Sequence, residues 1–138
     1  MNIRLLAFTM GLFLIIAGCG QSYNPARDKD CNGCDLTAAD LAGIILDNAQ
    51  LRGAKLIEAD LESADLSRAN LLDANLNSAN LSKAILRGVD LTGAILRGAD
   101  LTGAYLNRAN LTDTYPVSYT HLRAHETDSY LVCRLLLE

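Results

Sequence analysis

A leucine occupies every fifth position of this chain from Leu36 to Leu111, sixteen times without interruption. Five residues turn about 500° on an α-helix, so leucines at this spacing would spiral around the axis and form no apolar face. On a straight β-strand an odd period would send successive leucines to opposite faces of the sheet. The chain must therefore change direction once per repeat, which means that it turns a corner every five residues.

The residues around each leucine divide the repeat into inward and outward positions. We number them from one to five, with leucine at position three. Position one is alanine in thirteen of the sixteen repeats, and in an extended segment it points the same way as the leucine two residues on. Position two is Asp or Asn in ten repeats, and position five is glycine in six, which suits a tight turn with positive φ. So short a period predicts a solenoid whose turns bury their apolar edges on one another.

Runs such as ADLES-ADLSR-ANLLD-ANLNS-ANLSK resemble the pentapeptide-repeat family, whose pattern is A(D/N)LXX. The resemblance covers residues 34–113 and implies an all-β fold, a right-handed quadrilateral parallel β-helix with four repeats per coil. It implies about four coils, stacked about 4.8 Å apart. The departures from the pattern are Cys34, Ile44 and Val89 in place of alanine, and Ile45, Gln50, Lys55, Ile85, Ile95 and Tyr105 in place of Asp or Asn. We expect none of them to prevent the fold.

Residues 1–18 have the features of a bacterial lipoprotein signal peptide. A positive start is followed by an apolar run, Leu5 to Ile16, that is too short to be a permanent membrane helix. The sequence Ile16-Ala17-Gly18-Cys19 resembles a lipobox, which implies cleavage before Cys19 and acylation of that cysteine. A signal peptide with a chance cysteine is the alternative. The expected partner is the membrane, because multiple acyl chains at about 0.8 kcal/mol per buried CH₂ anchor a protein stably.

This interpretation places the mature protein outside the cytoplasm. The residue after the cysteine is Gly20, where an aspartate would commonly retain such a protein in the inner membrane. The outer membrane is therefore slightly favoured, if the cell has one. Residues 19–33 are expected to form a polar tether ahead of the solenoid.

Residues 114–138 leave the fivefold pattern. The stretches VSYTHLRAHET and LVCRLLLE within residues 117–138 resemble the translation of an adapter oligonucleotide used in short-read sequencing. We interpret residues 117–138 as an artefact of that origin and exclude them from fold reasoning. The native chain is then expected to continue differently after this point.

Cys31 and Cys34 form a pair close to the first predicted coil. In an oxidising compartment they could form a disulfide, or as reduced small residues they could cap the open end of the solenoid. A redox or metal role is the alternative, although a CxxC pair outside a βαβ unit is a weak indication of redox chemistry. A zinc pattern with His121 and His125 is discarded, because both histidines lie in the excluded tail and the gap between the pairs is far longer than in zinc fingers.

No catalytic pattern is present in the sequence. Outside the excluded tail there is no histidine, no Ser-x-x-Lys and no glycine-rich phosphate loop. A solenoid with a filled interior also offers no deep pocket. We therefore expect no catalysis, no cofactor, no metal site and no small-molecule substrate.

Residues twenty apart stack on one side of a four-sided coil. One side carries a column with Asp40, Asp60 and Asp100 and has a net charge of −3, while the next has a net charge of +1 and presents Ile45, Ile85 and Tyr105 outward. Single outward apolar residues are ordinary, and missing native sequence could cover the stacked pair of Ile85 and Tyr105. A surface for an unidentified protein partner is the sharper interpretation.

These observations favour a lipid-anchored structural or protein-interaction module of the cell envelope that binds no nucleic acid. Three alternatives stay open. Some relatives imitate the acidic rod of DNA and bind topoisomerase, but the net charge of −4 is small and export would separate the protein from cytoplasmic enzymes. The others are a CxxC redox protein and a secreted effector, and nothing in the residues addresses the last.

Overall fold

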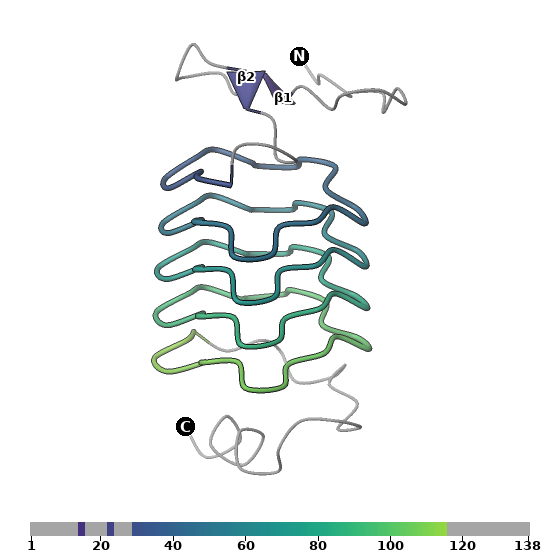
Figure 1. The fold of residues 1–138 in the computed structure, drawn as a ribbon, viewed down its shortest axis with the longest axis vertical. Helices are drawn as coiled ribbons and strands as arrows, with labels where there is room; N and C mark the ends of the chain where they lie inside the picture. Colours follow the sequence, from purple (N-terminus) through teal and green to yellow (C-terminus); the bar gives the residue numbers. More distant parts are fainter. Residues whose placement is uncertain (1–13, 16–21, 24–28, 116–138) are drawn as a thin grey trace.

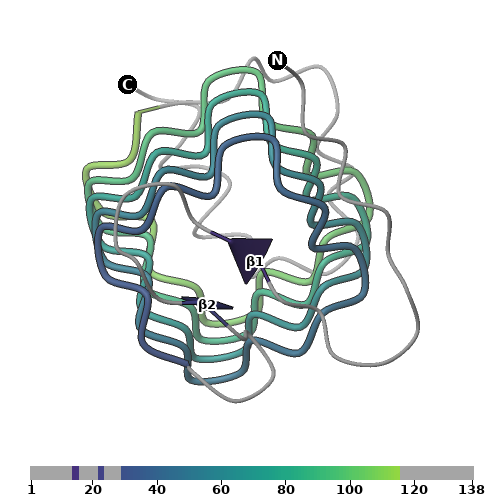
Figure 2. The same cartoon turned by 90° about the horizontal axis from the view of Figure 1, so that it is seen from above.

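The structure is a computed structural model that describes residues 14–15, 22–23 and 29–115. Two short strands, β1 (Leu14–Ile15) and β2 (Ser22–Tyr23), pair antiparallel with Leu14 opposite Tyr23. Residues 29–115 wind into a solenoid (Figure 1). Seen from one end, its coils superimpose around a four-cornered outline (Figure 2). None of the described residues belongs to a helix long and apolar enough to cross a membrane.

The coils are joined by parallel bridges between residues twenty apart, from Asp30–Gln50 at one end to Ile95–Tyr115 at the other. Four repeats therefore make one coil, and the predicted four-sided parallel β-helix is confirmed. We name the coils by their residues: coil one is 29–48, coil two 49–68, coil three 69–88 and coil four 89–108. Each bridge joins the position-two residues of two repeats. One residue between successive corners therefore takes part in the β-pairing.

Four of the five backbone N–H groups of a central repeat have a role in the coil-to-coil or corner hydrogen bonds, as residues 64–68 show. The N–H of Asp65 donates to Ile44 in the preceding coil (2.8 Å), and those of Leu66 and Arg68 donate to Ile85 and Arg87 in the following coil (both 2.8 Å). The N–H of Ala64 closes the corner by donating to the carbonyl of Leu61 (3.0 Å). Only the N–H of position four, here Ser67, has no backbone acceptor.

The side chain at position two supplies that missing acceptor. In all ten repeats with Asp or Asn at this position, an Oδ1 atom accepts the N–H of position four, at distances from 2.9 to 3.3 Å. Short Asx side chains reach the backbone two residues ahead, which is why turns favour them. The Asp/Asn preference therefore completes the hydrogen bonding of the corner.

An Asn75→Ala substitution is expected to lower the free energy of unfolding by about 1 kcal/mol, the typical net value of one hydrogen bond. The Oδ1 atom of Asn75 accepts the N–H of Asn77 at 3.1 Å, and alanine leaves that donor without a partner. Chemical denaturation would measure the loss, and Asn75→Asp should retain most of the stability.

Gln50→Ala is the matched control for Asn75→Ala. Gln50 also occupies position two, but the N–H of Arg52 donates to Asn32 (2.9 Å) and does not depend on Gln50. A loss for Gln50→Ala equal to that for Asn75→Ala would contradict this role of the side chain.

The core consists of the residues at positions one and three. The leucines from Leu51 to Leu91 are fully buried, and alanines such as Ala54, Ala64 and Ala74 beside them are equally inaccessible. Alanine leaves room for the larger leucine at each corner. The two inward positions predicted from the sequence are therefore those that fill the solenoid.

Position five has positive φ in every described repeat, whether or not it is glycine. Glycine occupies this position in some repeats only, and elsewhere non-glycine residues occupy it with φ between 54° and 61°. They are Ala38, Asn48, Glu58, Ser63, Arg68, Asp73, Ser78, Lys83, Arg108 and Asp113. A positive φ at the second corner residue is the requirement of a type II turn, and repeated packing imposes it on ordinary residues at an energetic cost.

The solenoid extends beyond the predicted limits of residues 34–113. Residues 29–33, predicted to belong to the polar tether 19–33, form a further repeat in which Cys31 takes the leucine position and Asp30 bridges Gln50. At the other end Tyr115 continues the pattern as a position-two residue. The leucine count missed both segments because neither contains the leucine that defines the period. Of the remaining tether, Ser22 and Tyr23 form β2, while residues 19–21 and 24–28 lie outside the described residues, as does the suspect tail, 117–138.

Candidate interaction surface

The four sides of the solenoid differ in chemistry. We name each side after the first leucine that occupies position three on it. The Leu46 side comprises residues 44–48, 64–68, 84–88 and 104–108. The Leu41 side comprises residues 39–43, 59–63, 79–83 and 99–103. The Leu36 side comprises residues 34–38, 54–58, 74–78, 94–98 and 114–115. The Leu51 side comprises residues 29–33, 49–53, 69–73, 89–93 and 109–113.

The Leu46 side carries an outward column with three apolar members. Parallel bridges align Ile45, Asp65, Ile85 and Tyr105 on successive coils. Ile45 is 64% exposed and Tyr105 is 40% exposed, whereas Ile85 is half-buried between its neighbours. The structure therefore brings the three predicted apolar residues into one column, with Asp65 between the first two.

Arginines flank this column. The Cζ atom of Arg87 lies 5.8 Å from the centre of the Tyr105 ring, within the range of a cation–π contact. Arg68, Arg87 and Arg108 outnumber the acidic residues Asp47 and Asp65, so this side has a net charge of +1. Tyrosine and arginine are enriched among the residues that contribute most to binding energy at protein interfaces.

Lys29 neutralises one of the acidic residues on the Leu46 side. Its ammonium contacts the carboxylate of Asp47 and donates to the Asp47 carbonyl at 2.9 Å. The hydrogen bond from Lys29, with another from Asn48, lowers the pKa of Asp47. The Thr37 hydroxyl and N–H, with nearby Lys55, similarly lower the pKa of Asp35 on the Leu36 side.

The lowered pKa values of Asp35 and Asp47 predict that the fold loses stability in acid. Because the folded state lowers both pKa values, the ionised groups stabilise the fold above the ordinary aspartate pKa of about 3.9. This contribution disappears as the pH falls through the lower, folded values. Thermal unfolding followed from pH 7 to pH 3 should show Tm falling below about pH 4.

An Asp47→Asn variant separates the contribution of Asp47 from general acid effects. It should show a shallower fall in Tm over this range than the unchanged protein. The difference should shrink in high salt, which screens exposed ion pairs. Identical pH profiles for the two proteins would contradict the role of Asp47.

The Leu41 side is the most acidic of the four. Asp40, Asp60, Glu62 and Asp100 stand against Lys83 and give a net charge of −3. Much of this charge serves the fold. Asp60 accepts the N–H of Glu62 (3.0 Å) and the side-chain amide of Asn80 (2.9 Å). Lys83 donates to Glu62 at 2.7 Å, and this contact raises the pKa of Lys83.

The sequence prediction missed a second apolar pair, on the opposite Leu36 side. Ile95 and Tyr115 are bridged on successive coils, and Tyr115 is 61% exposed. The leucine pattern assigns Tyr115 to the tail 114–138, because the next residue is Pro116 and not leucine. Its spacing of ten residues from Tyr105 and twenty from Ile95 would have placed it at position two.

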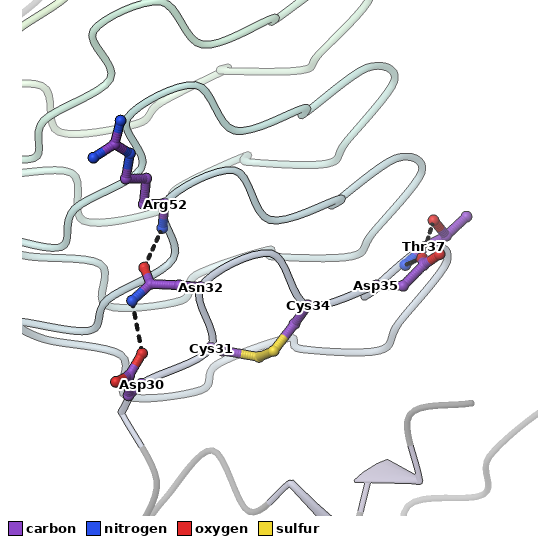
Figure 3. The surroundings of a disulfide bond; sticks show 7 residues. All are labelled: Asp30, Cys31, Asn32, Cys34, Asp35, Thr37 and Arg52. Carbon is purple, nitrogen blue, oxygen red and sulfur yellow. Dashed lines mark hydrogen bonds between the residues drawn. A yellow bond between two sulfur atoms is a disulfide. The ribbon is translucent and has the colours of Figure 1, made fainter. Parts of the chain in front are cut away.

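The two cysteines lie at the corner that begins the described solenoid. A disulfide joins Cys31 and Cys34, with their Cα atoms 5.2 Å apart (Figure 3). Among the described residues no group of three or more His, Cys, Asp or Glu side chains is placed to hold a metal ion. Cys19, His121 and His125 lie outside the described residues, so acylation of Cys19 stays a prediction.

The comparisons identify the class of protein that this geometry defines. The family profile described as "Pentapeptide repeats (8 copies)" matches residues 34–73 and 74–113. The chain therefore belongs to the pentapeptide-repeat family, and its solenoid is the right-handed quadrilateral β-helix that the resemblance implied. No curated protein sequence matches the chain significantly.

Solved structures of the same family resemble the chain. The pentapeptide repeat protein Rfr23 from the cyanobacterium Cyanothece 51142 shares 36% identity over 67% of this chain and 63% of its own, with a TM-score of 0.64. The chain thus covers less than two thirds of that protein. AT2G44920, from the Arabidopsis thaliana thylakoid lumen, shares 27% identity over 69% of this chain and 68% of its own, with a TM-score of 0.48. HetL, from Nostoc sp. PCC 7120, shares 35% identity over 62% of this chain and 46% of its own, with a TM-score of 0.38.

Proposed function

We propose that this protein is a lipid-anchored interaction module of the bacterial cell envelope, held in the membrane by Cys19. It contacts a protein partner through the Leu46 side. Its role is structural or protein-binding and involves no catalysis. A filled core of leucine and alanine leaves the outer columns as the surfaces on which binding can occur.

The outward apolar column carries this proposal, because the chain breaks its own repeat rule there. Each Asp or Asn at position two completes a corner, and the hydrogen bond is worth about 1 kcal/mol. Ile45 and Ile85 cannot accept the N–H of position four, and neither belongs to the buried core, since Ile45 is exposed and Ile85 is only half-buried. A departure that lowers stability and exposes apolar surface is typical of a binding site.

The distribution of charge argues against mimicry of DNA. Double-stranded DNA carries one charge per about 1.7 Å, so a rod as long as four coils, about 19 Å, would require about eleven. The most acidic side of the solenoid has a net charge of −3, and the adjacent Leu46 side is positive. A protein partner that meets Tyr105 and its arginines fits this pattern better than an enzyme built to hold DNA.

Acyl labelling tests the anchor. The native protein should incorporate labelled fatty acid and sediment with membranes, and Cys19→Ala should abolish the label and release the protein from lipid. A Cys19→Ala protein that stays membrane-bound, together with absence of label from the native protein, would refute the anchor.

Site-specific photo-crosslinking tests the partner surface independently of the anchor. A photoreactive side chain at Tyr105 should form a discrete protein adduct in intact cells, and Arg87→Glu should remove that adduct. The same group at exposed Gln50, on the Leu51 side where the position-two column has no apolar residue, is the control and should form none. Equal adducts from both positions would contradict a specific surface on the Leu46 side.

A further inference from the structure

The Cys31–Cys34 disulfide replaces the inward pair that every other corner builds from apolar side chains. Cys31 occupies the leucine position of its repeat and is only 2% exposed, while Cys34 occupies the alanine position of the next and is partly buried. Their backbones also close the corner, since the N–H of Cys34 donates to the carbonyl of Cys31 at 3.2 Å. One covalent bond therefore spans the same turn that leucine and alanine span by packing (Figure 3).

Coil one is held less firmly than the coils that follow it. A central coil exchanges hydrogen bonds with both neighbours, but the N–H groups of Asp35, Asp40 and Ile45 have no backbone acceptor among the described residues. The position-one residues Ala39 and Ile44 are only partly buried, in contrast to fully buried Ala54 in coil two. In a solenoid each repeat is stabilised mainly by its neighbours, so the terminal coil opens first.

The disulfide lies where such opening would begin. Two contacts to coil two flank it: the N–H of Cys31 donates to Gln50 at 2.7 Å and that of Gly33 donates to Arg52 at 2.8 Å. Asn32 adds a side-chain contact by accepting the N–H of Arg52 at 2.9 Å. Fixing Cys31 to Cys34 holds all three groups in the geometry that coil two requires.

We propose that the Cys31–Cys34 disulfide is a reducible lock on coil one, and that a dithiol reductant releases this coil while the later coils stay folded. A thiolate of the reductant attacks Cys34 Sγ, because Cys31 is buried. The Sγ–Sγ bond breaks, a mixed disulfide forms on Cys34, and Cys31 leaves as a thiolate that takes up a proton. The second thiol of the reductant then attacks the mixed disulfide, which frees Cys34 and leaves the reductant oxidised by two electrons.

The reduced coil lacks both the covalent bond and the packing of the consensus pair. A cysteine side chain fills less of the interior than leucine, so reduction does not return the corner to an ordinary repeat. The Cys31 thiolate also emerges in an apolar site, where desolvation opposes its charge. Reduction is therefore slow while coil one is closed, and coil one stays open once it is reduced.

Hydrogen exchange tests the lock directly. In the oxidised full-length protein, the coil-one amides that donate to coil two, such as those of Cys31, Gly33 and Leu36, should exchange slowly, and dithiothreitol should accelerate them at least tenfold. Amides of residues 69–88 in coil three should not change. The control is the double variant Cys31→Leu/Cys34→Ala, which restores the consensus pair and should exchange slowly with or without reductant.

A monothiol reductant tests the direction of attack, because it leaves a mixed disulfide on the sulfur that it attacks. In the oxidised protein, brief exposure to glutathione and rapid alkylation of the freed thiol should place glutathione on Cys34 and the alkyl group on Cys31, as located by peptide mass spectrometry. Equal amounts of glutathione on the two cysteines would overturn the assignment of Cys34 as the attacked sulfur. The lock itself would be overturned by a free thiol pair in the native protein, by exchange that reductant does not alter, or by simultaneous loosening of coil three. None of these outcomes depends on the lipid anchor or on the Leu46 side.

Discussion

A Leu71→Ala variant is expected to lose about 2–5 kcal/mol of unfolding free energy, the range for truncating a buried leucine. Leu71 is fully buried in coil three, with Leu51 and Leu91 at the equivalent positions of the adjacent coils. Alanine would leave a void between two coils whose spacing is fixed by their hydrogen bonds, so the walls cannot collapse to fill it. Chemical denaturation followed by circular dichroism would measure the loss.

Two further substitutions show whether the loss comes from the core. Ile45→Ala also truncates an aliphatic side chain, but Ile45 is 64% exposed and the expected change is within about 0.5 kcal/mol. Leu106→Ala lies in coil four at 5% exposure and should cost less than Leu71→Ala, because fewer neighbours surround it. Similar losses at Leu71 and Ile45 would mean that the leucine ladder does not dominate stability.

The fivefold period determines the fold because only one arrangement buries the apolar residues of every repeat. Leucine and alanine two residues apart point inward, and an odd period then forces a corner after them. The number of repeats per coil came from the family resemblance. The bridges between residues twenty apart, such as Ile85–Tyr105, confirm that value.

The finer structure of the corner could not be predicted from the period. The sequence shows that Asp and Asn are frequent at position two. Their role depends on which N–H group has no backbone acceptor in the hydrogen bonds between coils. That donor, at position four, is identifiable only once the ladder is known. For the same reason Lys83 could not be recognised as a positive-φ residue: its backbone is set by the coils above and below.

The candidate surface was predicted in outline. The sequence predicts that Ile45, Ile85 and Tyr105 share one side, and their column follows from their spacing once each coil is assigned four repeats. The contact of Arg87 with Tyr105 and that of Lys29 with Asp47 depend on long side chains that cross between coils, so the repeat pattern does not specify them. The sequence identifies Cys31 as half of a cysteine pair. It does not place Cys31 in the core, because residues 29–33 form a repeat that has cysteine where the pattern has leucine.

Gly93→Ala is expected to destabilise the fold by about 1–3 kcal/mol, the cost of a strained backbone with an added contact. Gly93 has φ of +68°, which penalises any residue with a Cβ atom. A Cβ built there would lie 2.7 Å from Oδ1 of Asp73 in the preceding coil, so that carboxylate must move. Its ion pair with Arg52, at 3.7 Å, would then be disturbed as well.

Gly43→Ala separates the two causes, since Gly43 has φ of +65° and no atom within 4 Å of the added Cβ. It carries the backbone penalty alone, expected to be about 1 kcal/mol because ordinary residues occupy this position elsewhere in the solenoid. In an Asp73→Ser background the cost of Gly93→Ala should fall toward that of Gly43→Ala. If the cost at Gly93 is unchanged in that background, the contact with Asp73 contributes nothing and backbone strain accounts for the whole effect.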